Sequence, residues 1–243
     1  FDRQPAVDFI IGPQSYHKVP EIISRLKDGE RNVIETSFQA SDKFKTIASL
    51  EVKPKPSAFV TIQEGCDKFC TFCVVPYTRG KEVSRSHKDI LREILESAKK
   101  GVKEVILLGQ NVNSYNFEGI SFPSLIYSLA EIDDIKRIRF MTSHPRDMTD
   151  ELIRAFGNIS KLMPFLHLPV QSGSNRILKS MNRGHIVEEY LEIINKLRVV
   201  RKDICFSSDF IVGYPGETEK DFQETIDLCE KVQFSQAYSF NYS

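Results

Sequence analysis

From residue 58 onward, short apolar runs alternate with amphipathic stretches along the chain. The runs that predict strands occupy 58–63, 102–108, 138–141, 165–168, 205–212 and 236–240. Apolar residues recur at helical spacing over 86–101, 123–129, 149–156, 174–181, 186–201 and 218–229. Strands that alternate with helices predict parallel βα units, so we expect an α/β fold, either an open sheet or a partial (βα)6 barrel.

Residues 1–57 follow a different pattern. Val7–Gly12 predicts a short strand, and the apolar positions over 19–26 predict one helix that ends near Gly29. Lys53-Pro54-Lys55-Pro56 predicts a stiff, charged linker. One strand and one helix are too little for a domain. We therefore expect 1–57 to be the tail of an N-terminal domain, 58–243 to be a second domain, and the chain to be a fragment.

Polar residues and glycines follow the predicted strands. They are Glu64-Gly65-Cys66, Gly109-Gln110-Asn111, Ser143-His144, Val170-Gln171-Ser172 and Gly213-Tyr214. Ligands of parallel sheets and barrels bind at the carboxyl ends of the strands. The sequence therefore predicts a functional site at this edge.

Three cysteines, Cys66, Cys70 and Cys73, follow the first of these strands. Three thiolates in one short loop can bind one face of a soft metal centre. A structural zinc would need a fourth ligand, and the next candidates along the chain are His87 and Cys205. A 4Fe–4S cluster can use three cysteines and leave one iron open to a small molecule. The spacing favours the cluster, and a zinc site is the alternative.

Composition limits the remaining functions. Five cysteines, three of them crowded, do not form a disulfide framework, so we expect a reduced cytosolic protein with Cys205 and Cys229 as buried free thiols. The apolar runs are too short to cross a membrane. With 33 basic and 33 acidic residues, RNA binding would need a local basic patch. One candidate is the segment 66–92, where basic residues outnumber acidic ones. The basic residues are Lys68, Arg79, Lys81, Arg85, Lys88 and Arg92, and the acidic residues are Asp67, Glu82 and Asp89.

The cysteine motif and its flanks resemble a known family. Cys-x3-Cys-x2-Cys after the first strand of a βα repeat resembles the radical S-adenosylmethionine (SAM) superfamily. Longer segments are similar to the MiaB-type tRNA methylthiotransferases of that superfamily: Gln63–Gly80, Leu107–Tyr115, Ser143–Arg146, Leu166–Ser174 and Asp209–Thr218.

The resemblance implies an activity and its cofactors. The reaction would add a methylthio group to C2 of N6-isopentenyladenosine beside the tRNA anticodon. Cys66, Cys70 and Cys73 would bind a 4Fe–4S cluster whose fourth iron binds SAM. Flavodoxin or ferredoxin would donate the electrons that reduce this cluster. The protein would be a monomer. A second, auxiliary cluster would use cysteines that precede Phe1, and an RNA-binding TRAM domain would follow Ser243.

Several side chains are candidates for contacts with SAM. Gln110 stands where the superfamily often has a glutamate that contacts the SAM amino group, and Arg183 would pair with the SAM carboxylate. Gln171 and Ser172 would face SAM or form a turn. Asp209 would contact a ribose hydroxyl or be a satisfied buried carboxylate.

Other residues have structural interpretations. We expect His144 and His167 to be hydrogen-bonded structural histidines. Phe69 and Phe72 are expected to shield the cluster from solvent.

Three alternatives stay open at this stage. Related methylthiotransferases modify a ribosomal-protein aspartate or threonylcarbamoyladenosine in tRNA, although Val74–Gly80 and Gly109–Asn113 are more similar to the isopentenyladenosine branch. The third alternative is a non-catalytic metal-binding RNA module, which would bind metal without cleaving SAM.

Overall fold

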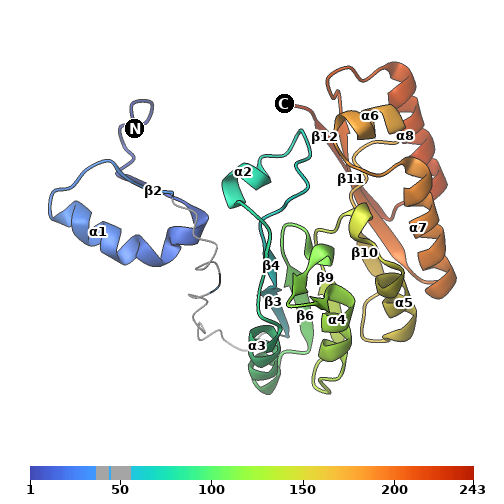
Figure 1. Cartoon of the computed structure of the whole chain (residues 1–243), viewed down its shortest axis with the longest axis horizontal. Coiled ribbons are helices and arrows are strands. Elements are labelled where there is room, and N and C mark those ends of the chain that lie inside the picture. The colour runs from blue at the N-terminus through green and yellow to red at the C-terminus, as the bar shows by residue number, and fades with distance from the viewer. Residues whose placement is uncertain (37–43, 45–55) are drawn as a thin grey trace.

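The structure is a computed structural model that describes residues 1–36, 44 and 56–243 (Figure 1). The predicted linker, apart from Pro56, lies outside the described residues. Among the helices of the described residues, none is long and apolar enough to cross a membrane.

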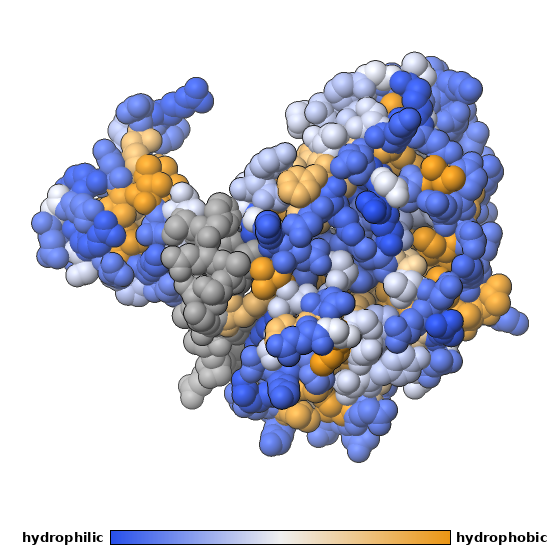
Figure 2. Space-filling view, viewed as in Figure 1, coloured by the Kyte–Doolittle hydropathy of each residue, from blue (hydrophilic) through white to orange (hydrophobic). Residues whose placement is uncertain are grey.

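The N-terminal unit is a small α/β arrangement. It comprises β1 (Phe9–Ile11), the 3-10 helix η1 (Pro13–Lys18), α1 (Val19–Lys27) and β2 (Val33–Glu35), and β1 pairs with β2 in parallel. The predicted strand and helix are confirmed, whereas β2 is too short to produce a periodic signal. Ile10 and Ile34 are paired on the two strands and are 40% and 60% exposed, and hydrophobic residues gather on this unit in Figure 2. The assignment of 1–57 to a larger domain stays a prediction.

Six parallel strands form the second part of the chain. They are β3 (Ser57–Thr61), β6 (Glu104–Leu108), β9 (Arg137–Phe140), β10 (Phe165–His167), β11 (Cys205–Val212) and β12 (Gln236–Asn241). The orders are β3-β6-β9 and β10-β11-β12. A parallel bridge between Ile138 and Leu162 joins the two sheets just before β10. The predicted alternation of parallel strands with helices is confirmed.

The intervening helices cover the outside of the strands (Figure 1). They are α3 (His87–Lys99), α4 (Phe122–Ala130), α5 (Asp150–Asn158), α6 (Asn175–Ser180), α7 (Val187–Val200) and α8 (Glu219–Val232). The hydroxyls of Thr149 and Thr218 accept hydrogen bonds from the backbone at the starts of α5 and α8, as expected of N-caps.

The core lies between the strands and this helical layer. Val105 and Leu107 of β6 are fully buried, and the rings of Phe122, Phe140 and Phe156 pack against one another. Burial of these residues explains why the β6 segment is almost continuously apolar in sequence. The rigid layer of helices and strands holds the loops at the carboxyl ends of the strands.

Several short elements that follow β3 in the chain were not predicted from the sequence. They are β4 (Gln63–Glu64), α2 (Val75–Arg79), β5 (Val83–Ser84), β7 (Asn116–Phe117), β8 (Ile120–Ser121) and the 3-10 helices η3 (Val112–Ser114) and η4 (Pro145–Asp147). The predicted strand over 58–63 ends at Thr61, because Gln63 and Glu64 turn to pair antiparallel with β5. Elements of two to five residues are too short to show hydrophobic periodicity.

Candidate functional site

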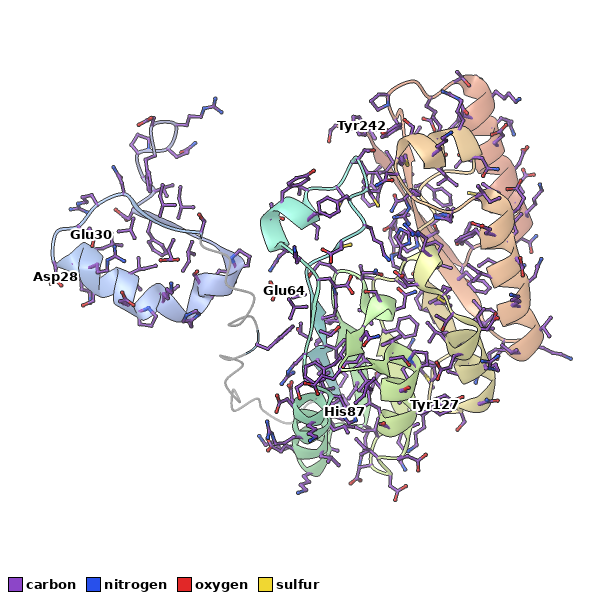
Figure 3. All side chains as sticks on the ribbon, in the orientation of Figure 1. Asp28, Glu30, Glu64, His87, Tyr127 and Tyr242 are labelled. Atoms are coloured by element: carbon purple, nitrogen blue, oxygen red, sulfur yellow. The ribbon has the colours of Figure 1, made fainter. Side chains whose placement is uncertain are left out.

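The cysteine loop, residues 65–74, leaves β4 and leads into α2 (Figure 1). Figure 3 shows Glu64 at the base of this loop. Gly65 has φ of +84°, and a Cβ at this position would lie 2.2 Å from the Lys81 carbonyl oxygen. Glycine is therefore required where the loop begins, because both the backbone angle and the close approach exclude a side chain.

A buried glutamine ties this loop to the end of the neighbouring strand. Gln63 Oε1 accepts hydrogen bonds from the backbone N–H of Gln110 at 2.9 Å and of Asn111 at 3.0 Å. Its Nε2 donates to the Gly65 carbonyl at 2.5 Å. Gln110 Oε1 in turn accepts from the Gly65 N–H at 2.7 Å. Gln63 was not among the predicted site residues, although a glutamine at the end of a buried strand is a usable signal.

Replacement of Gln63 with leucine should therefore be costly. The change leaves the partly buried N–H of Gln110 and the buried N–H of Asn111 without acceptors, and we expect the free energy of unfolding to fall by about 3 kcal/mol. Urea denaturation would measure the loss. The matched control is Gln223→Leu on the exposed surface of α8, with an expected change of about 0.5 kcal/mol or less. Equal losses in the two variants would contradict the role assigned to Gln63.

The three cysteines lie close together in this loop. Cys70 is buried, and Cys66 and Cys73 are partly buried. Burial raises the pKa of the Cys66 thiol, and the neighbouring Cys70 and Cys73 also act to raise this pKa. No group of three His, Cys, Asp or Glu side chains within the described part of the chain is arranged as a metal site. The three thiols share one loop, and their role as ligands of one metal centre stays a prediction.

Arg183 extends its guanidinium into the same region. Its Nη1 donates to Cys70 Sγ at 3.4 Å and its Nη2 donates to the Pro169 carbonyl at 2.5 Å. The residue is only 4% exposed, yet its Nε–H has no partner. Buried N–H groups are nearly always paired. This donor therefore has the chemistry of a site for an anionic group beside the cysteines.

The turn after α6 clamps the cysteine loop. Asn182 Nδ2 donates to the carbonyls of Lys68 at 3.2 Å and Phe69 at 3.0 Å. The Thr71 N–H donates to the Met181 carbonyl, and the Thr71 hydroxyl lies 2.7 Å from the Tyr214 hydroxyl. On the other side, Lys68 forms an ion pair with Asp147 at 2.7 Å. The loop is thus held by segments far from it in sequence.

Two buried histidines, His144 and His185, lie near Arg183. The His144 and His185 rings are perpendicular with centroids 5.8 Å apart, and the Nε2 atom of each has no partner. His144 Nδ1 accepts from the Arg146 N–H, so its proton is assigned to Nε2, whereas His185 Nδ1 donates to the Arg183 carbonyl. Burial, followed by the Arg183 charge, lowers both pKa values, that of His185 to about 4. Both imidazoles are therefore neutral at pH 7.

Asn111 adds another unpaired polar atom near this region. Its Nδ2 donates to Asp147 Oδ2 at 2.7 Å, while its buried Oδ1 has no partner. Arg183 and His144 therefore offer unpaired donors, and Asn111 and His185 offer unpaired acceptors. Such a mixture suits a ligand that has both positive and negative groups.

The other predicted contact residues are Gln171 and Ser172, which follow β10 in the chain, and Asp209, which lies within β11. Gln171 has φ of +82°, and its backbone pairs with Asp209 and Ile211. The fully buried Ser172 accepts from the Ser174 N–H and lies near Thr225 of α8. The proposed SAM contacts of Gln171, Ser172 and Asp209 stay predictions.

His167 has a hydrogen-bonding environment of its own. Its Nδ1 lies 2.8 Å from Ser207 Oγ, and its Nε2 lies 3.5 Å from Asp209 Oδ2. His167 is thus a hydrogen-bonded histidine, as expected, whereas His144 is only partly satisfied.

The expectation that Cys205 is buried was wrong. Cys205 is exposed because it is the first residue of β11, at the end of the strand away from the site. Phe69 is 49% exposed, and its expected role in shielding the cluster stays a prediction. Phe72, by contrast, packs partly buried against Ile177, Met181 and Tyr214.

Two relatives are similar along nearly the whole chain. The tRNA-2-methylthio-N(6)-dimethylallyladenosine synthase of Ruegeria pomeroyi is 54% identical over 246 residues, which cover 99% of this chain and 56% of that protein. The enzyme of the same name from Rickettsia akari is 53% identical over 248 residues, which cover 100% of this chain and 56% of that protein. The chain thus spans little more than half the length of these relatives.

Solved structures share the fold at low sequence identity. The radical SAM methyltransferase TsrM from Kitasatospora setae matches with a TM-score of 0.63 and 13% identity, covering 77% of this chain and 36% of that chain. Coproporphyrinogen III oxidase from Escherichia coli, described as a radical SAM enzyme, matches with a TM-score of 0.57 and 19% identity, covering 86% and 48% of the two chains. These likenesses concern the fold alone.

The sequence match to a family agrees with the arrangement of strands and cysteines. Residues 60–229 match the radical SAM superfamily, and this range includes β6, β9, β10, β11 and the complete cysteine loop. Six parallel strands with three cysteines after the first one are the pattern predicted from the sequence. The chain belongs to the radical SAM superfamily.

Proposed function

We propose that this chain is the radical SAM part of an enzyme that adds a methylthio group to C2 of N6-isopentenyladenosine in tRNA. The observation that carries the proposal is 54% identity, over 99% of this chain, to a tRNA-2-methylthio-N(6)-dimethylallyladenosine synthase. The three cysteines of one loop and the unpaired buried Nε of Arg183 beside Cys70 support the proposal.

Cys66, Cys70 and Cys73 are the proposed ligands of a 4Fe–4S cluster. Their donor set fits the cluster because three thiols share one short loop, and the partly exposed ones leave access for a small molecule. When bound, the reduced cluster would supply the electron that cleaves SAM. The raised pKa of Cys66 implies that cluster binding releases a proton from this thiol.

Arg183 is the proposed partner of the SAM carboxylate. Its unpaired Nε–H and its position beside Cys70 would place a carboxylate next to the cysteines. Gln110 fits a SAM contact less directly, because its side-chain oxygen already accepts from Gly65. Asn111 Oδ1 is the neighbouring unpaired acceptor and is the better candidate for an ammonium group.

The conservative variant Arg183→Lys tests this assignment. Lysine keeps the charge but loses the planar set of donors, so we expect the Kd for SAM to rise about tenfold or more. Isothermal titration of the protein with SAM measures this change. The matched control is Arg154→Lys, on the exposed side of α5. An unchanged Kd in Arg183→Lys would remove Arg183 from the SAM site.

The remaining partners follow from the proposed reaction. They are a tRNA with the modified adenosine, SAM, and a small electron-transfer protein such as flavodoxin or ferredoxin. We expect a monomer that acts in the cytoplasm. A second, auxiliary 4Fe–4S cluster is expected in the full-length protein, with cysteines that are not among those of this sequence.

The proposal is tested with the complete gene product, loaded with iron and sulfide under anaerobic conditions. Dithionite, SAM and tRNA containing N6-isopentenyladenosine are added, and nucleosides are analysed by mass spectrometry. Formation of the 2-methylthio nucleoside together with 5′-deoxyadenosine supports the proposal. A product on threonylcarbamoyladenosine or on ribosomal protein would assign a related substrate instead. A zinc-loaded, colourless protein that leaves SAM intact would indicate a binding module.

A further inference from the structure

We propose that the exposed rings of Phe69 and Tyr77 form a platform that stacks an unpaired base of the RNA substrate. This inference rests on the proposed function and names the residues that would position the RNA at the site. Phe69 belongs to the cysteine loop, and Tyr77 belongs to α2, which directly follows that loop (Figure 1).

The two rings form a pair that is open to solvent. Phe69 is 49% exposed and Tyr77 is 72% exposed. Their centroids lie 6.1 Å apart with an interplanar angle of 82°. In such an edge-to-face pair one ring supports the other, and a ring face is left for a further aromatic group. The neighbouring Val74 is 62% exposed and extends the apolar surface.

The backbone at Phe69 is strained in the conformation that exposes its ring. Phe69 has φ of +49°, a left-handed conformation that bulky residues rarely adopt. A bulky residue in this conformation lowers the stability of the fold by about 1–3 kcal/mol, and the conformation persists only where surrounding contacts fix it. Here the fixing contact is the hydrogen bond from Asn182 Nδ2 to the Phe69 carbonyl at 3.0 Å. The loop thus holds a half-exposed aromatic ring in a fixed position beside the cysteines.

The platform adjoins the proposed reacting centre. Phe69 directly precedes Cys70, whose sulfur accepts a hydrogen bond from Arg183. A base stacked on Phe69 would therefore be held at the margin of the cysteine loop. Stacking there would orient the nucleotide that reacts or one of its immediate neighbours.

An unpaired base fits this surface better than an apolar protein partner. The three exposed side chains offer roughly 300–400 Å², whereas a stable protein interface needs about 800 Å² from each partner. Bases stack on single aromatic side chains irrespective of their sequence. The exposed Lys81 and Lys88 follow in the chain, within a segment where basic residues outnumber acidic ones, which suits the flanking phosphates.

Two variants test the platform in the complete, cluster-loaded gene product. Tyr77→Ala removes one ring outside the cysteine loop. Phe69→Asn removes the other ring with a residue that tolerates the left-handed backbone, so that the loop is not forced to rearrange. The matched control is Tyr127→Ala on α4, which lies away from α2 (Figure 3). The probe is a single-stranded RNA containing 2-aminopurine, whose fluorescence reports stacking, and Kd is measured by fluorescence titration.

We expect Kd to rise about tenfold for each platform variant and to stay unchanged for the control, with the quenching by stacking reduced. The inference is overturned if the parent protein does not bind the RNA, or if both variants bind it as the parent does. Cluster content, measured by absorbance, must be retained for a weaker Kd to count in its favour. Methylthiolation is assayed separately, so that a negative result there would overturn the proposed function while RNA stacking on the platform could still be established.

Discussion

Replacement of Cys70 with alanine is expected to abolish both cluster binding and SAM cleavage. Cys70 is the buried cysteine of the loop, and its sulfur accepts the hydrogen bond from Arg183. A cluster that uses three cysteines cannot keep its open iron in place when one of them is lost. We expect 5′-deoxyadenosine formation to fall by about three orders of magnitude, which corresponds to about 4 kcal/mol.

The measurement combines absorbance of the reconstituted cluster with chromatography of the 5′-deoxyadenosine formed. Cys205→Ala is the matched control, because Cys205 is exposed at the other end of β11. Circular dichroism separates loss of the cluster from loss of the fold. A Cys70→Ala variant that keeps a normal cluster and cleaves SAM at the parent rate would disprove the assignment of this cysteine as a ligand.

Acidification should destabilise the fold through His144 and His185. Burial lowers the pKa of His185 from 6.5 to about 4, and the pKa of His144 shifts in the same direction. The unfolded chain therefore takes up protons before the folded chain does. The stability is fully present above pH 6.5 and is lost as pH falls towards 4, at about 1.4 kcal/mol per pH unit for each histidine.

Urea denaturation at several pH values between 7 and 4.5 tests this expectation. His185→Gln removes one titrating group, so the decline in unfolding free energy with falling pH should become less steep than in the parent. The control is His17→Gln in η1, where the histidine is exposed. The same steep decline in the parent and in His185→Gln would show that His185 does not cause it.

The sequence predicted the framework of the radical SAM part well. Five of the six parallel strands, β3, β6, β9, β10 and β11, and the helices between them produce clear patterns because they bury side chains in the core, whereas all six residues of β12 are exposed. The cysteine loop was found because its spacing is a chemical signature that does not depend on packing. Arg183, predicted from the resemblance, lies beside Cys70, which is 113 residues earlier in the chain, and its contact with SAM stays a prediction.

The residues that organise the loop could not be predicted in the same way. Gln63 acts through three hydrogen bonds to backbone groups, and such contacts have no sequence period. The exposure of Phe69 depends on a left-handed backbone angle that a clamp from Asn182 fixes. Local sequence indicates a phenylalanine next to cysteines and therefore favours a shield. Only the folded structure shows that about half of the ring is exposed to solvent.

The clamp from Asn182 also sets an order of events during synthesis. Its hydrogen bonds reach Lys68 and Phe69 across 114 and 113 residues of chain. At about 5–20 residues per second, the ribosome needs roughly 6–20 s to make that intervening stretch. The cysteines therefore leave the ribosome well before the turn that shapes their loop. Iron loading into the correctly shaped loop becomes a late step of maturation, and until then the nascent thiols are open to oxidation or to the wrong metal.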